Sequence, residues 1–281
     1  MILRNNITEV AYNVQTTVDA KHCLDYKVTN QNDAHAMGNM LRRAKTILNH
    51  NEFTALYDKG YHTGSQLAYA DNLGIETLVA IPATASHAPD WNYDIEHFIY
   101  NQQNDCYICP EGETLSTNGK WYTKDRTSTS VKIKHYKTDK CTNCPVFEKC
   151  TKNKAGRLIE RNQYQLHIDN NARRMGQNKQ LYKRRQAIVE HPFGIIKRQW
   201  DFYYIMTKRT IKRASADVGL VFCAFNLRRI FNILDRSTLK AYLKALAFIF
   251  RIGTACFKPQ CAFLFFLLKY WVPFCSDKLA A

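Results

Sequence analysis

The order of the elements favoured by the first 82 residues constrains the fold of this chain more than any other feature. Apolar and polar residues alternate from Val10 to Val18, which predicts a half-buried strand that ends near Asp19. Strands interleaved with helices along the chain predict an α/β fold. The elements predicted after this strand are a return strand at 24–28, a helix at 35–49, a strand at 53–57, a helix at 66–73 and a strand at 77–81.

A different texture follows, because helical periodicity disappears from about Ala83 to Asn171 while turn residues, aromatics and cysteines dominate. We therefore expect a loop-dominated insertion without a core of its own. Beyond it, residues 178–204 are predicted to form a long helix kinked near Pro192. Residues 212–234 are predicted to form an amphipathic helix.

The C-terminal tail, residues 236–281, is rich in Phe and Leu. Its longest uninterrupted apolar run, Cys261–Leu268, is far shorter than the roughly 20 residues that a membrane span needs. We therefore expect no membrane partner. The predicted divisions are 1–82 and 172–235, which carry the core, 83–171, the insertion, and 236–281, the atypical tail.

The charge distribution indicates a polyanionic partner. The chain of 281 residues has a formal net charge of +16. Between Arg173 and Arg213 there are twelve Lys or Arg residues, with only Glu190 and Asp201 as acids. Such a surface attracts phosphates by counterion release. A lone acid among these cations would repel phosphate unless a divalent metal ion bridges the two, which makes Glu190 a candidate metal ligand.

Two further acids stand at the ends of predicted strands, namely Asp19 and Asp58. Phosphoryl transfer by two metal ions needs carboxylates that converge from separate elements. Mg²⁺ and Mn²⁺ prefer such oxygen ligands. Each acid alone is more simply explained as a solvated turn or cap residue, so the hypothesis of a site depends on Asp19, Asp58 and Glu190 acting together.

Three ordered motifs, Tyr12–Asp19, Tyr57–Tyr61 and Tyr182–Gly194, resemble those of the DDE transposases of bacterial insertion sequences. The resemblance covers roughly residues 8–232. It implies an RNase H-like mixed sheet flanked by helices, with a cysteine-rich insertion before the helix that bears the last acid. It also implies that Asp19, Asp58 and Glu190 bind two Mg²⁺ or Mn²⁺ ions.

The activity that this resemblance implies is DNA strand cleavage followed by transfer of the 3′ end to target DNA. The partners would be double-stranded DNA and a second copy of the chain. Relatives carry a further N-terminal region that recognises the transposon end, so we expect a truncated copy. An RNase H-like nuclease without strand transfer and a non-catalytic DNA-binding remnant are the alternatives.

Basic residues near the three acids are the candidate DNA contacts. Lys59 follows Asp58 directly, and Lys197 lies seven residues, or two α-helical turns, after Glu190. Similar transposases place a Tyr, an Arg and a Lys at fixed spacings around the Glu. Here the spacing from Arg185 to Glu190 is one residue longer than in that pattern. The candidate DNA-binding residues are Lys59, Arg185, Lys197 and Arg198.

Ten cysteines form a second constellation, five of them between Cys106 and Cys150. The start of the chain has no apolar signal region, so we expect reduced thiols and a cytoplasmic location. Clustered reduced thiols fit structural zinc, an iron–sulfur cluster, or no ligand at all. The resemblance favours Cys109, Cys141, Cys144 and Cys150 as zinc ligands, with Cys106 as the alternate.

Overall fold

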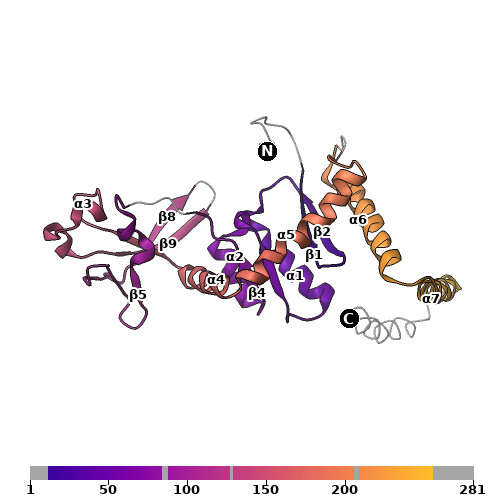
Figure 1. Ribbon diagram of the computed structural model, residues 1–281, viewed down its shortest axis with the longest axis horizontal. Helices are drawn as coiled ribbons and strands as arrows, with labels where there is room; N and C mark the ends of the chain where they lie inside the picture. Colours follow the sequence, from indigo (N-terminus) through magenta and orange to yellow (C-terminus); the bar gives the residue numbers. More distant parts are fainter. Residues whose placement is uncertain (1–11, 84–87, 127–128, 206–208, 256–281) are drawn as a thin grey trace. The chain divides into compact units, whose positions relative to one another are not determined.

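The computed structural model describes residues 12–83, 88–126, 129–205 and 209–255 (Figure 1). The chain divides into a first compact unit, Met1–Gly219, and a second, Leu220–Ala281. The start of the first predicted strand at Val10 and the apolar run Cys261–Leu268 lie outside the described residues.

The first unit opens with an antiparallel hairpin of β1 (Asn13–Val18) and β2 (Cys23–Thr29), as the alternating sequence predicted. Asn13 pairs with Thr29 at the open end, and Val18 pairs with Cys23 next to the turn. Helix α1 (Met37–Leu48) follows and buries Met37, Met40, Leu41 and Ala44. Ile47 is half exposed, because the buried stripe ends one turn earlier.

Strands β3 (Thr54–Tyr57) and β4 (Glu76–Val79) pair in parallel, and α2 (Gly64–Asn72) connects them. This βαβ unit is the α/β element that the sequence predicted. The α/β class is therefore confirmed. The apolar cluster between these strands and helices consists of Met37, Leu41, Leu67, Ala70, Ile75 and Val79.

A single RNase H-like mixed sheet is not present in the described part of the chain. There, β1 pairs with β2 and β3 pairs with β4, as two separate two-stranded sheets. No ladder of backbone hydrogen bonds joins the hairpin to the parallel pair. The family resemblance implied one mixed sheet, whereas sheet assembly depends on long-range pairing that the sequence pattern does not encode.

Residues 88–162, which we call the cysteine-rich module, contain more regular structure than predicted. Two three-stranded antiparallel sheets form, with the orders β5-β6-β7 and β10-β9-β8. Except for the eight-residue β9, their strands have two to five residues, too few to show a clear alternation. They also enclose a core, which the sequence did not predict, of Phe98, Tyr107, Leu115, Tyr136 and Ile159. The strands are β5 (Ile99–Asn101), β6 (Cys106–Ile108), β7 (Thr114–Leu115), β8 (Tyr122–Arg126), β9 (Thr129–Tyr136) and β10 (Ile159–Asn162).

The helix predicted at 178–204 is shorter, and another helix precedes it. Helix α4 (Gln165–Gln177) begins in the stretch 83–171 that was expected to be loop, and α5 (Lys179–Gly194) follows after one residue. Pro192 lies inside α5, and the chain changes to a π-helical turn, η6 (Ile195–Gln199). The remaining short elements are η1 (Asp33–His35), η2 (Lys59–Tyr61), η3 (Trp91–Tyr93), η4 (Ile95–His97), η5 (Asp139–Asn143) and α3 (Phe147–Cys150).

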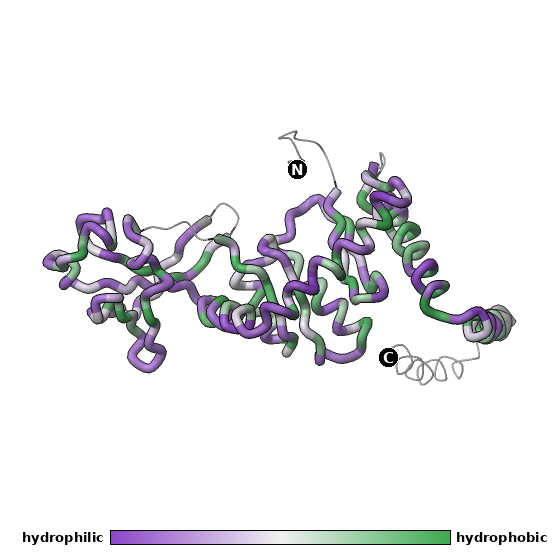
Figure 2. Tube along the Cα trace, viewed as in Figure 1, coloured by the Kyte–Doolittle hydropathy of each residue, from purple (hydrophilic) through white to green (hydrophobic). Residues whose placement is uncertain are grey.

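Helix α6 (Ile211–Ile233) confirms the helix predicted at 212–234 and runs across the division between the units. Its apolar residues do not form one buried face, because Leu220, Leu227 and Phe231 are exposed. Its stretch 218–225 is mostly hydrophobic, whereas stretch 182–186 of α5 is hydrophilic (Figure 2). In the second unit, α7 (Arg236–Ala255) begins after Asp235, whose Oδ1 accepts from the backbone N–H groups of Ser237 and Thr238, each at 2.8 Å. Among the described residues, no helix combines the length and the apolar character that crossing a bilayer requires.

Asn171 joins α4 to the parallel strands. Its side chain is fully buried, and its Nδ2 donates to Val79 O at 2.9 Å while its Oδ1 accepts from Val79 N at 3.0 Å. The amide thus satisfies both backbone groups of Val79 as a neighbouring strand would. This pairing holds α4 against β4.

Replacement of Asn171 by alanine should therefore leave two buried backbone groups of Val79 without partners. We expect Asn171→Ala to lower the free energy of unfolding by about 2–4 kcal/mol, measured by urea denaturation. Asn170→Ala is the matched control, because Asn170 is not buried and its contact is to the exposed Arg173. Equal stability of the two variants would contradict the role given to Asn171.

Candidate functional site

Asp58 lies where β3 ends, at the N-terminus of the short helix η2. Its Oδ1 accepts a hydrogen bond from Gly60 N at 3.0 Å, and its side chain is partly buried. Aspartate is favoured at this position because its carboxylate accepts hydrogen bonds from the first free N–H groups of the helix. The second carboxylate oxygen remains available for a ligand, since no described contact occupies it.

Asp19 lies in the turn of the β1–β2 hairpin, where its carboxylate is already engaged. Its Oδ1 accepts from Lys21 N at 2.6 Å and from His22 N at 2.5 Å. These contacts are those of an aspartate that stabilises a turn. The side chain is about half exposed.

The acid beside Asp58 is Asp33, which the sequence did not single out. A Cβ atom added at Gly60 would lie 3.2 Å from Asp58 Oδ1 and 3.9 Å from Asp33 Oδ2, so the two carboxylates flank one glycine. Burial raises the pKa of the Tyr61 phenol, and the negative charges of Asp33 and Asp58 raise it further. Both acids therefore face the same small region.

Asp33 and Asp19 lie at opposite ends of the hairpin. Asp33 Oδ1 accepts from Asn13 Nδ2 at 2.7 Å and from Gln15 Nε2 at 3.1 Å, at the start of β1. Asp19 follows the end of β1, roughly 20 Å from Asn13 at about 3.3 Å per residue. An antiparallel return strand brings its following residues back to the start of the first strand, so the sequence could have placed Asp33 near Asn13, but not beside Asp58.

Glu190 projects from α5 and is exposed. Within the described residues it makes no hydrogen bond or ion pair, so both of its oxygens are available. Helix α5 is fixed to β3 by Tyr182, whose Oη donates to Tyr57 O at 2.9 Å, one residue before Asp58. Glu190 lies eight residues further along α5, a rise of about 12 Å.

The structure therefore does not gather Asp19, Asp58 and Glu190. Throughout residues 12–83, 88–126, 129–205 and 209–255, no three Asp, Glu, His or Cys side chains lie close enough to hold a metal ion. Asp58 and Glu190 belong to elements that contact each other, whereas Asp19 is at the far end of a separate hairpin. Their joint role in metal binding stays a prediction.

The four predicted DNA contacts form no ion pair with any carboxylate of the described residues. Lys59, Lys197 and Arg198 are exposed, and Arg185 lies over the ring of Tyr182 at 5.7 Å. The prediction that Lys197 lies two turns after Glu190 assumed that residues 190–197 form one continuous α-helix. The π-helical turn begins at Ile195, so this spacing no longer fixes their common face.

Four cysteines of the cysteine-rich module line one pocket. They are Cys109, Cys141, Cys144 and Cys150, the same four that were predicted as zinc ligands. Cys106 does not line this pocket, because it is buried in β6. The four side chains face one space, but no three of them lie close enough together to hold a metal ion.

Backbone N–H groups form tight turns around these cysteines. Glu113 N donates to Cys109 Sγ at 3.3 Å, and Gly112 N donates to Cys109 O at 2.9 Å. On the other side of the pocket, Cys144 N donates to Cys141 O at 3.2 Å. An N–H group that points at a sulfur stabilises the thiolate form. The donor set, four thiols with such a turn, fits a tetrahedral zinc ion.

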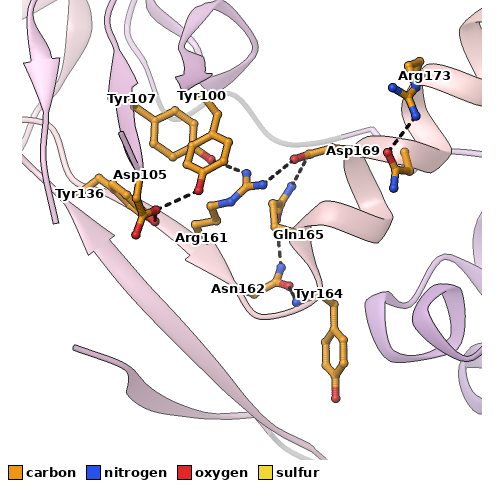
Figure 3. Close-up of polar contacts among 11 residues, drawn as sticks. Tyr100, Asp105, Tyr107, Tyr136, Arg161, Asn162, Tyr164, Gln165, Asp169 and Arg173 are labelled. Carbon is orange, nitrogen blue, oxygen red and sulfur yellow. Dashed lines mark hydrogen bonds and ion pairs between the residues drawn. The ribbon is translucent and has the colours of Figure 1, made fainter. Parts of the chain in front are cut away.

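Arg161 joins the module to α4 (Figure 3). Its Nη1 donates to Tyr107 Oη at 3.0 Å, and its Nη2 contacts Asp169 Oδ2 of α4 at 2.9 Å. The guanidinium stacks on the ring of Tyr100, with its carbon 3.7 Å from the ring centroid. Since α4 is held to β4 by Asn171, this arginine links the module to the strand pair through one helix.

Asp105 anchors the same network at the turn between β5 and β6 (Figure 3). Its Oδ1 accepts from Tyr100 Oη at 2.8 Å and from Tyr136 Oη at 2.6 Å, and its Oδ2 accepts from Lys134 Nζ at 2.7 Å. Partial burial acts to raise the pKa of Asp105, but these hydrogen bonds outweigh it and lower the pKa to about 2.

The lowered pKa gives a pH-dependent prediction for Asp105→Asn, a substitution that tolerates the φ of 45° at this position. The charged form is favoured in the folded state, so its contribution is present above the unfolded pKa near 3.9 and lost as pH falls towards about 2. We expect the variant to be about 1–2 kcal/mol less stable at pH 7, with the difference shrinking below about pH 4.

The control for this measurement is Glu96→Gln, which changes an exposed acid of the same module. Urea unfolding at several pH values would show whether the Asp105 difference changes with acidity. A difference that stays constant from pH 7 to the acid limit of folding would contradict the proposed role of its charge.

Comparison with known families bears directly on this arrangement. The family described as "Transposase DDE domain" matches residues 108–231. No curated protein and no solved structure gives a significant match. The resemblance to DDE transposases is confirmed, and residues 108–231 are similar to the transposase DDE domain family.

Some of the candidate residues lie inside the matched stretch and others precede it. It contains Glu190, the three basic residues Arg185, Lys197 and Arg198, and the four pocket cysteines. It runs without interruption from the cysteine-rich module through α4, α5 and most of α6. Asp19, Asp58 and Lys59 precede it.

Proposed function

We propose that the chain is a DDE transposase that cuts DNA at the ends of an insertion sequence and joins the freed 3′ ends to target DNA. The family match over the helix that bears Glu190 carries the proposal. The Tyr182–Tyr57 hydrogen bond supports it, since it ties this helix to the strand that ends at Asp58. The basic surface of α5 suits a DNA partner.

Asp58 and Glu190 would hold divalent metal ions together with one further acid and phosphate oxygens of the DNA. Bound Mg²⁺ or Mn²⁺ would activate the attacking hydroxyl and stabilise the leaving oxygen. The residues of the chain supply the ligands and orient the strand, with Lys59, Arg185, Lys197 and Arg198 as phosphate contacts. The reaction would take place in the cytoplasm on paired element ends, with two copies of the chain.

Either Asp19 or Asp33 would be the third acidic metal ligand. The sequence motif favours Asp19, whereas the geometry beside Gly60 favours Asp33. If Asp19 is the ligand, the β1–β2 hairpin must change its position when metal and DNA bind. If Asp33 is the ligand, Asp19 only stabilises its turn.

Both DNA cleavage and strand transfer should depend on Asp58 and Glu190, and the two activities can be measured in one assay. The substrate is a plasmid that carries the chain's own coding sequence with its flanking DNA, incubated with Mn²⁺. We expect Asp58→Asn and Glu190→Gln each to reduce cleavage and strand transfer at least about 100-fold, because each removes a carboxylate from the metal. Glu96→Gln is the control, because it changes an exposed acid of the cysteine-rich module.

The same assay decides between the alternatives. Cleavage without joined products would indicate a nuclease, and DNA binding without cleavage would indicate a non-catalytic remnant. Loss of activity in Asp33→Asn but not in Asp19→Asn would assign the remaining acid to Asp33, and the opposite pattern would assign it to Asp19. Wild-type activity in Glu190→Gln would contradict the proposed function.

We further propose that Cys109, Cys141, Cys144 and Cys150 bind a structural zinc ion. Their common pocket and the N–H···S contact at Cys109 support this. Burial raises the pKa of the Cys150 thiol, although the nearby Arg157 acts to lower it. Bound zinc would hold the thiols as thiolates and would join the loop after β6 to the segment that carries α3.

Zinc content gives a direct check. We expect the purified protein to contain about one zinc ion per chain and Cys141→Ser to lose it, because three thiolates bind zinc much more weakly than four. Cys106→Ser is the matched control, since Cys106 is a cysteine of the same module outside the pocket. Equal zinc loss in both variants, or iron in place of zinc, would contradict the assignment.

A further inference from the structure

Arg157 is a buried cation in the wall of the cysteine pocket. Its side chain is 8% exposed, and it lines the same space as the four cysteines. Its Nη1 donates to Cys150 O at 3.3 Å, and its guanidinium carbon lies 5.4 Å from the ring centroid of Phe98. Its Nε is buried and has no hydrogen-bond acceptor among the described residues.

The backbone is built to bring this arginine against the thiols. Gly156, just before it, has a φ of +91°, a conformation that other residues rarely adopt. A Cβ atom at Gly156 would lie 2.8 Å from Cys141 Cβ. The glycine therefore allows the chain to pass directly behind Cys141 and to direct Arg157 into the pocket.

Among the described residues, no carboxylate neutralises Arg157. The two acids in the pocket wall, Glu111 and Glu113, have other partners: Glu111 accepts from Tyr93 Oη at 2.8 Å, and Glu113 binds Lys140 Nζ at 2.7 Å. In the described part of the chain, no Asp or Glu lies within ion-pairing distance of Arg157. A buried cation without an anion is unfavourable, so the pocket itself should supply negative charge.

Four neutral thiols cannot supply that charge. Four thiolates around one divalent ion leave a net negative charge, which a guanidinium beside them would compensate. We propose that Arg157 is the counter-charge of a metal–tetrathiolate centre, so that its positive charge sets the affinity of the pocket for a divalent metal. This inference rests on the proposed zinc site and adds a residue that is not a ligand.

Substitutions that separate charge from shape test the role of Arg157. Arg157→Met and Arg157→Gln remove the charge, and Arg157→Lys keeps it while losing the guanidinium fork. Zinc affinity is measured on the full chain by competition with a chelator, and bound Co²⁺ is followed by its absorption spectrum. Arg161→Met is the control, because Arg161 is also a buried arginine of the module but does not line the pocket.

We expect both neutral variants to bind zinc about 10–100-fold more weakly than wild type. Arg157→Lys should stay within about threefold of wild type, because it retains the positive charge. The Co²⁺ spectrum should keep its tetrathiolate form, since the ligands are unchanged. Arg161→Met should lower the melting temperature without changing the zinc affinity of the folded protein.

Two results would overturn the inference while leaving the zinc site in place. The first is a zinc affinity equal to that of wild type in both neutral variants. The second is a loss of zinc affinity in Arg157→Lys as large as in the neutral variants, because this would assign the effect to packing and hydrogen bonding instead of charge. A wild-type protein that binds neither Zn²⁺ nor Co²⁺ would instead remove the proposed zinc site, and this inference with it.

Discussion

The attachment of α4 and α5 to the parallel strands is the interaction on which the rest of the first unit depends. Asn171 pairs with the backbone of Val79, and Tyr182 donates to the carbonyl of Tyr57. The Asn171 contact satisfies backbone groups that would otherwise lack partners, so it is costly to lose. The carbonyl of Tyr57 also accepts from Ala80 N at 3.2 Å, so the Tyr182 contact adds a second hydrogen bond there. Through them, the helix that bears Glu190 and the strand that ends at Asp58 become parts of one packed body.

The cysteine-rich module is attached to this body through the same helix. Arg161 reaches from β10 to Asp169 of α4, while its guanidinium stacks on Tyr100 (Figure 3). The family match extends over both the module and the helix of Glu190. Metal binding by the four pocket cysteines would therefore stabilise the part of the chain that positions α4, at a distance from the proposed chemistry.

Local patterns predicted most elements of the N-terminal part, because the alternation in β1 and the apolar stripe of α1 follow from residue spacing. The pattern did not reveal the short strands of the module or helix α4, since strands as short as Thr114–Leu115 show no period. For the site, the cysteine set could be predicted from spacing and resemblance. The neighbour of Asp58 could not, because the position of Asp33 depends on tertiary packing across Gly60.

In the proposed function, Asp58 and Glu190 hold the same metal centre when DNA is bound. The most direct test is a crystal of the chain with Mn²⁺ and DNA that carries an element end, examined by anomalous diffraction at the manganese edge. We expect a manganese peak coordinated by carboxylate oxygens of both Asp58 and Glu190, with Asp19 or Asp33 completing the set. Manganese bound at Asp58 while Glu190 remains free in solvent would contradict it.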